Sequence, residues 1–71
     1  MSLVQKLKPH IEDLKVHKQP SEQNSTERRL NQLTMLILNK TMDPKVKDKL
    51  LREIVAESQV EKVLKSKGIR V

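Results

Sequence analysis

The sequence contains no cysteine, no aromatic residue and a single glycine, and each of these absences excludes a class of protein. Without cysteine there can be neither a disulfide framework nor a cysteine-ligated zinc site. With Gly68 as the only glycine, no glycine-rich phosphate-binding loop can form. Because Phe, Trp and Tyr are missing, no aromatic ring is present to stack on unpaired bases, which weakens a role in binding RNA or single-stranded DNA.

Long hydrophobic runs are also missing. Every apolar stretch is far shorter than the roughly 20 residues that a membrane-spanning helix needs. The segment from Met1 to Leu7 is too short and too polar for a secretory signal. We therefore expect a soluble, cytoplasmic protein with no membrane contact.

The apolar residues that are present make a small core. In 71 residues there are ten Leu, seven Val, four Ile, three Met and one Ala. A single domain of this size typically retains only about 3 to 5 kcal/mol of net stability. We expect one domain, stabilised further by self-association.

The first part of the chain predicts one short helix and a linker. Residues from Pro9 to His17 are expected to form the helix, because proline suits the first helical turn. Residues 1–8 are then a frayed or kinked extension. Residues 19–26 are wholly polar and contain Pro20, which predicts a linker that leaves the first helix loosely tethered.

Three further helices are predicted from start and stop signals. Asn24 and Glu27 fit a capping box for a central helix that starts near residue 26 or 27 and ends near residue 40 or 41. The pair Asp43–Pro44 starts a helix that runs to about residue 57, with Val46, Leu50 and Ile54 as its inner row beside Leu51 and Val55. A second capping box, Ser58 with Glu61, starts a helix over about residues 59–67 that buries Val60, Val63 and Leu64, and Gly68 resembles a left-handed helix end. The fold class predicted is all-α, a small bundle of three to four short helices.

The central helix carries the most informative segment. Residues 33–38 include five apolar side chains in six positions, so they point to all sides of the helix. One side of this helix must therefore be covered by the first helix, a second copy or another protein. We predict a non-enzymatic interaction or regulatory protein that docks on a protein partner or forms a homo-oligomer through the apolar side of residues 30–42. Its partner-binding residues are Leu30, Leu33, Met35, Leu36, Leu38 and Met42.

The sequence offers little for catalysis or cofactor binding. His10 and His17 are seven residues apart, about 10 Å along a helix, so one metal ion cannot bridge them. Asp13, four residues before His17, would give that histidine mild electrostatic support. The serines are better placed as helix caps and surface groups than beside a catalytic base. We expect no enzyme activity, no small-molecule substrate, no cofactor and no metal site.

The charge distribution supports an alternative function. The net charge is +6, and the C-terminal end is the basic pole. Basic clusters of this kind favour polyanions, so the alternative is a DNA-binding regulator that contacts backbone phosphates. The residues concerned are Arg28, Arg29, Lys62, Lys65, Lys67 and Arg70. The opposing interpretation is a solvated face that only keeps the protein soluble.

Overall fold

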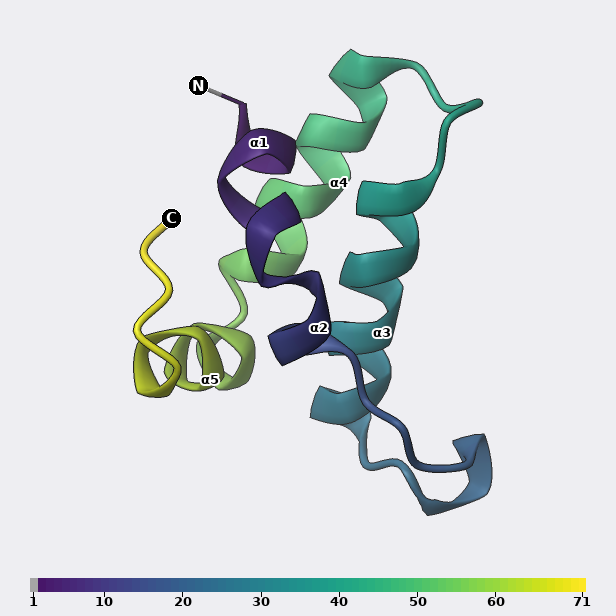
Figure 1. The fold of residues 1–71 in the computed structure, drawn as a ribbon, viewed down its shortest axis with the longest axis vertical. Coiled ribbons are helices and arrows are strands. Elements are labelled where there is room, and N and C mark those ends of the chain that lie inside the picture. Colours follow the sequence, from purple (N-terminus) through teal and green to yellow (C-terminus); the bar gives the residue numbers. More distant parts are fainter. Residues whose placement is uncertain (1) are drawn as a thin grey trace.

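The computed structural model describes residues 2–71, and within this range the regular structure is entirely helical (Figure 1). The all-α prediction is confirmed. The elements are α1 (Leu3–Leu7), the 3₁₀ turn η1 (Lys8–His10), α2 (Ile11–Leu14), the 3₁₀ turn η2 (Pro20–Glu22), α3 (Ser25–Leu38), α4 (Pro44–Val55) and α5 (Ser58–Ser66).

The N-terminal segment differs from the expected helix over residues 9–17. A helix begins at Leu3, capped by the Ser2 hydroxyl, which accepts a 3.3 Å hydrogen bond from the Gln5 amide. Pro9 lacks an amide hydrogen, and the chain accommodates it in the tighter turn η1 before α2 continues to Leu14. Of the two forms expected for residues 1–8, frayed or kinked, residues 3–7 are not frayed, because they are helical and Leu7 is fully buried, and η1 interrupts the helix where the kink was expected. Met1 lies outside the described residues.

The connection between α2 and α3 is fastened to α3. The Val16 amide donates to Asn31 Oδ1 at 2.9 Å, and Asn31 Nδ2 donates to the Val16 carbonyl at 3.3 Å. Lys18 Nζ lies 3.1 Å from Glu27 Oε2. The linker predicted over residues 19–26 contains η2 and the start of α3, so the first helices are held to the rest of the fold.

Helix α3 starts as predicted but ends earlier. Asn24 accepts from the Glu27 amide at 2.8 Å and Glu27 accepts from the Asn24 amide at 3.1 Å, which confirms the capping box. The helix stops at Leu38 because the next side chain, Asn39, binds the amides of Thr41 and Met42 and turns the chain.

Helix α4 runs antiparallel to α3 and packs the predicted face against the core, except at Val46. Asp43 caps it by accepting a 2.8 Å bond from the Lys45 amide. Leu51 and Ile54 form the buried stripe, whereas Val46 is 50% exposed. The expected inner row that began at Val46 is therefore wrong at its first position. The helix ends at Val55, two residues short of the predicted end.

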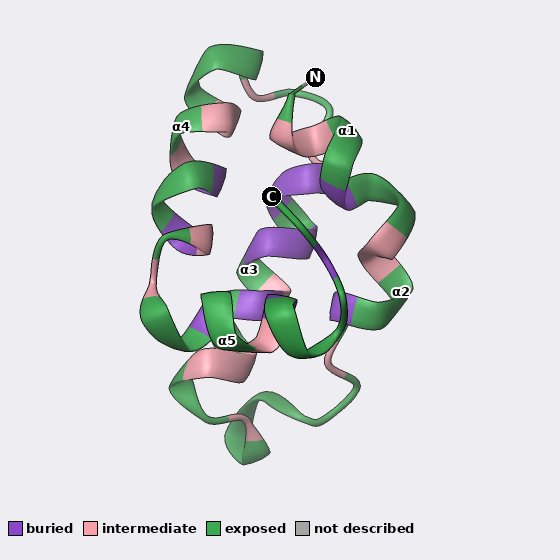
Figure 2. Ribbon diagram, turned by 90° about the vertical axis from the view of Figure 1, so that its left-hand side faces the viewer, coloured by how far each residue is buried: buried purple, intermediate pink, exposed green. Residues whose placement is uncertain are grey.

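Helix α5 crosses the end of the α3–α4 pair (Figures 1 and 2). Ser58 is its first residue and Glu57 occupies the cap position without a side-chain cap bond, so the second capping box is wrong. The predicted C-terminal stop is confirmed. Gly68 has φ +73°, its amide donates to the Lys65 carbonyl, and the Ile69 amide donates to the Leu64 carbonyl, the bonding pattern of a Schellman motif.

One cluster of buried side chains joins all five α-helices to the C-terminal tail. Its members are Leu7, Leu14, Leu30, Leu33, Leu36, Ile37, Leu51, Ile54, Val60, Leu64 and Ile69. Figure 2 shows the buried stretches of the helices facing inward around α3. The radius of gyration, 11.5 Å, is close to the roughly 11 Å expected for a folded chain of this length. Over residues 2–71, no helix has both the length and the apolar character needed to cross a bilayer.

Candidate interaction surfaces

The predicted partner-binding residues divide between the core and the surface. Leu30, Leu33 and Leu36 are at most 8% exposed and belong to the core of the chain itself. Met42 is half-buried against that core. Met35 and Leu38 lie outside, at 71% and 51% exposure. The apolar surface available to another molecule on α3 is therefore formed by Met35 and Leu38.

These two residues share one side of α3. They are spaced i,i+3, which places neighbouring side chains on the same helical face. No charged residue occurs from Leu30 to Asn39, although 34% of the chain is charged. We call Met35 and Leu38 the α3 patch. It is an apolar area on an uncharged part of a cationic protein.

Two arginines of the predicted basic cluster, Arg28 and Arg29, already have partners in the fold. Arg29 Nε lies 3.2 Å from Glu57 Oε1, and its Nη1 donates to Gln32 Oε1 at 2.8 Å. Arg28 Nη2 donates to the Pro20 carbonyl at 3.4 Å. The first pair joins α3 to the residue preceding α5, and the second holds η2 against α3. Both arginines therefore have structural contacts.

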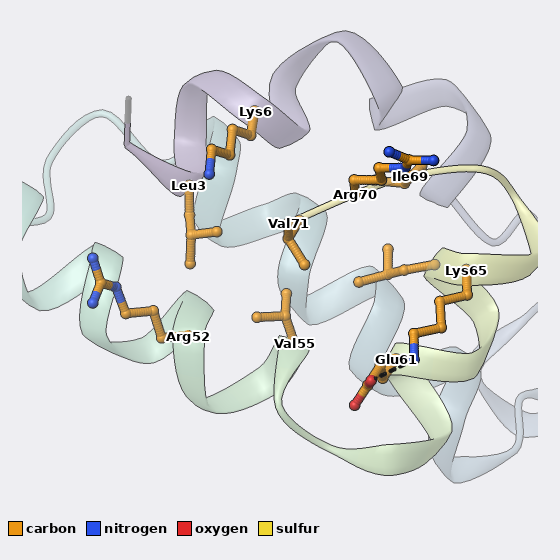
Figure 3. Close-up of a pocket in the computed structure, with 10 residues that line it drawn as sticks. Leu3, Lys6, Arg52, Val55, Glu61, Lys65, Ile69, Arg70 and Val71 are labelled. Atoms are coloured by element: carbon orange, nitrogen blue, oxygen red, sulfur yellow. Dashed lines mark ion pairs between the residues drawn. The ribbon is translucent and has the colours of Figure 1, made fainter.

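The C-terminal basic residues border a groove that the sequence did not predict. A cavity of about 710 Å³ lies between α1, α4, α5 and the C-terminal tail (Figure 3). Its apolar lining comes from Leu3, Val55, Leu64, Ile69 and Val71, and its charged lining from Lys6, Arg52, Glu61, Lys65 and Arg70. We call this the α1–α5 groove. Lys65 and Arg70 were both predicted as anion contacts, whereas Lys62 and Lys67 are exposed and do not line it.

The groove escaped sequence reasoning because its walls come from three distant segments. Residues 3–6, 52–55 and 61–71 are brought together by the packing of α1 and α5 on α4. Asp48 contributes to this placement, since its Oδ1 accepts from the Leu3 amide at 3.4 Å and its Oδ2 lies 2.8 Å from Arg52 Nε. The Asp48–Arg52 pair follows the favourable i,i+4 order on a helix. Leu3 and Asp48 are far apart in the sequence, so no local sequence pattern predicts the hydrogen bond between them.

The charges around the groove are not equally available. Glu61 Oε1 lies 2.9 Å from Lys65 Nζ, and this contact lowers the pKa of the Glu61 carboxyl below its usual value. Arg52 is paired with Asp48. Within residues 2–71, neither Lys6 nor Arg70 forms an ion pair. Two cations at the groove are therefore free to meet an external anion.

The histidines are arranged differently from the expectation. Since α2 ends at Leu14, His17 is not on the helix that carries Asp13. Asp13 Oδ2 lies instead 4.0 Å from His10 Nδ1. Across the described part of the chain, no group of three or more His, Asp or Glu side chains could hold a metal ion.

Comparison with protein-family models, with curated proteins and with solved structures returned no significant match.

Proposed function

We propose that the protein is a non-enzymatic interaction module that self-associates through the α3 patch. The exposure of Met35 and Leu38 carries this proposal. The other leucines and isoleucines of α3 are buried, so the helix leaves these two large apolar side chains at the surface. Covering both would remove them from water, at roughly 25 cal/mol for each Å² of apolar surface buried.

A second copy of the chain is the occupant that the charges favour. Two molecules that each carry a net charge of +6 repel one another over most of their surfaces. The uncharged stretch from Leu30 to Asn39 is where two copies can approach without opposing lysines. A two-fold axis beside α3 would place each Met35 near the partner's Met35 or Leu38, which is the self-complementary contact of a symmetric dimer. Small single domains gain stability from such association.

Sedimentation over a range of protein concentrations tests this proposal. We expect a reversible dimer in the unmodified protein and a monomer in the double variant Met35→Glu, Leu38→Glu, because four carboxylates would meet at the contact. Both positions are exposed, so the variant should keep the helical circular dichroism spectrum of the parent. Gln59→Glu, an exposed polar position on α5, is the control for added negative charge and should still dimerise.

Two results would contradict the proposal. One is a monomer at every concentration of the unmodified protein, and the other is a dimer that persists in the double variant. If the protein stays monomeric but binds an amphipathic helix of another protein through Met35 and Leu38, the patch has a different occupant and self-association is wrong.

A further inference from the structure

The α1–α5 groove combines an apolar floor with a cationic border. Figure 3 shows Val55 and Val71 pointing toward each other, with Leu3 beside them on α1. Lys6 and Arg70 reach the groove from α1 and from the tail. The site lies on different elements from the α3 patch, so an occupant here does not depend on self-association.

The charge of the groove selects an anionic occupant. The charged side chains that line it are Lys6, Arg52, Lys65 and Arg70, against one acidic side chain, Glu61. Glu61 is paired with Lys65, and Asp48 with Arg52, so the charged side chains left without an ion pair at the border, Lys6 and Arg70, are both cationic. Carboxylates approaching Lys6 and Arg70 would form ion pairs without displacing an internal partner.

The apolar floor distinguishes between anionic occupants. Leu64 and Ile69 are only 1% and 3% exposed, so they close the bottom of the groove and leave a shallow apolar surface between Leu3, Val55 and Val71. One or two apolar side chains of a ligand can lie on this shallow surface, whereas a long alkyl chain, as in a lipid, needs an enclosed cavity. A nucleic-acid backbone brings regularly spaced phosphates and has no apolar group to place there.

We propose that the α1–α5 groove binds an acidic segment of a partner protein, with apolar side chains of the segment on the Leu3–Val55 floor and its carboxylates on Lys6 and Arg70. Recognition then has two separable parts. Apolar contact places the segment, and the border charges select for Asp and Glu on either side of it.

Calorimetric titration with synthetic peptides tests the two parts. The probe is a short peptide of glutamates flanking two leucines. In one control peptide serine replaces the leucines, and in the other glutamine replaces the glutamates. We expect saturable binding of the probe, weaker binding of both controls, and a loss of affinity as salt is raised, because exposed charge contacts are screened. Bound probe should shift the amide resonances of Val55 and Arg70.

Variants of the protein locate the contact. Lys6→Gln with Arg70→Gln should weaken probe binding about tenfold, since each exposed ion pair contributes up to about fivefold in affinity. Lys40→Gln with Lys45→Gln removes the same charge at exposed positions outside the groove lining and should bind almost as tightly as the parent. Val55→Gln, which changes the floor alone, should weaken the leucine probe but not the serine control.

Several outcomes would overturn the proposal. The first is that the probe shows no saturable binding at millimolar concentration, and the second is that the serine control binds as tightly as the probe. The third is that the control pair Lys40→Gln, Lys45→Gln weakens probe binding as much as the pair at the groove. Displacement of the probe by a DNA duplex, lost with Lys6→Gln and Arg70→Gln, would identify the groove as a phosphate site and favour the nucleic-acid alternative. In the dimerisation assay these variants should behave as the parent does, so the two proposals fail independently.

Discussion

Leu7→Ala is the substitution that most directly tests how the N-terminal helix contributes to the fold. Leu7 is 0% exposed and belongs to the common core, although α1 is only five residues long. Truncating a buried leucine to alanine costs about 2 to 5 kcal/mol through lost burial and the cavity that remains. A core of this size provides about 3 to 5 kcal/mol in total.

The balance of these values predicts a large population of unfolded molecules. A loss of about 3 kcal/mol from about 4 kcal/mol leaves about 1 kcal/mol, or roughly one molecule in six unfolded without denaturant. Urea titration followed by circular dichroism measures the change in the free energy of unfolding. The midpoint should fall by more than half, with one transition for the whole chain.

Gln5→Ala is the matched control, because Gln5 is exposed on the same short helix. It should shift the free energy of unfolding by no more than about 0.5 kcal/mol. If Leu7→Ala changes stability as little as this control, α1 contributes nothing to the core and the packing described above is wrong. A separate early transition that involves only part of the helical signal would also contradict a single cooperative unit.

Three further predictions concern other local features. Gly68→Ala should destabilise the fold by about 1 to 2 kcal/mol, because alanine disfavours the left-handed backbone of this position. A steric clash does not contribute, since no atom lies within 4 Å of the added methyl group. Gly68→Asn should cost less than Gly68→Ala, and equal costs for the two variants would refute a conformational cause. Asn31→Ala should cost about 1 to 3 kcal/mol by leaving both backbone groups of Val16 without their partner, and should speed amide exchange at Val16. The pKa of the Glu27 carboxyl is held below its usual value by the Asn24 amide and by Lys18, so its contribution to stability is present above the unfolded-state pKa and disappears as the pH falls through the folded-state pKa. Glu27→Gln should therefore flatten the acid side of a stability profile measured by thermal melts, and an unchanged profile would contradict this account.

Features that depend on neighbours in sequence were predicted well. The Asn24–Glu27 capping box, the start of α4 at Asp43–Pro44 and the left-handed end at Gly68 are each set by residues within a few positions of one another. The apolar character of residues 33–38 predicted a helix covered on every side; four of these six residues are buried, and Met35 and Leu38 are exposed.

Features that depend on packing were predicted less well. Pro9 was expected to leave residues 1–8 as a frayed or kinked extension, but the choice between the two depends on packing: η1 accommodates the missing amide hydrogen, and the burial of Leu7 holds α1 on the core. The exposure of Val46, which was predicted to lie in the inner row, depends on how α4 is rotated against α3. The same limit applies to the candidate sites. Met35 and Leu38 could not be separated from Leu33 and Leu36 without the packing of α3, and the α1–α5 groove exists only when both ends of the chain meet on α4.

The position of Leu7 and Ile69 in one core has a consequence for biosynthesis. Helix α1 is synthesised before α4, the helix on which it packs, and before Ile69, which lies in the same core. During translation the apolar side chains of α1 therefore stay in water, or on a chaperone, until α4 and the residues up to Ile69 have left the exit tunnel. This core should therefore form in one step after residues 3–69 have emerged, instead of growing helix by helix during elongation.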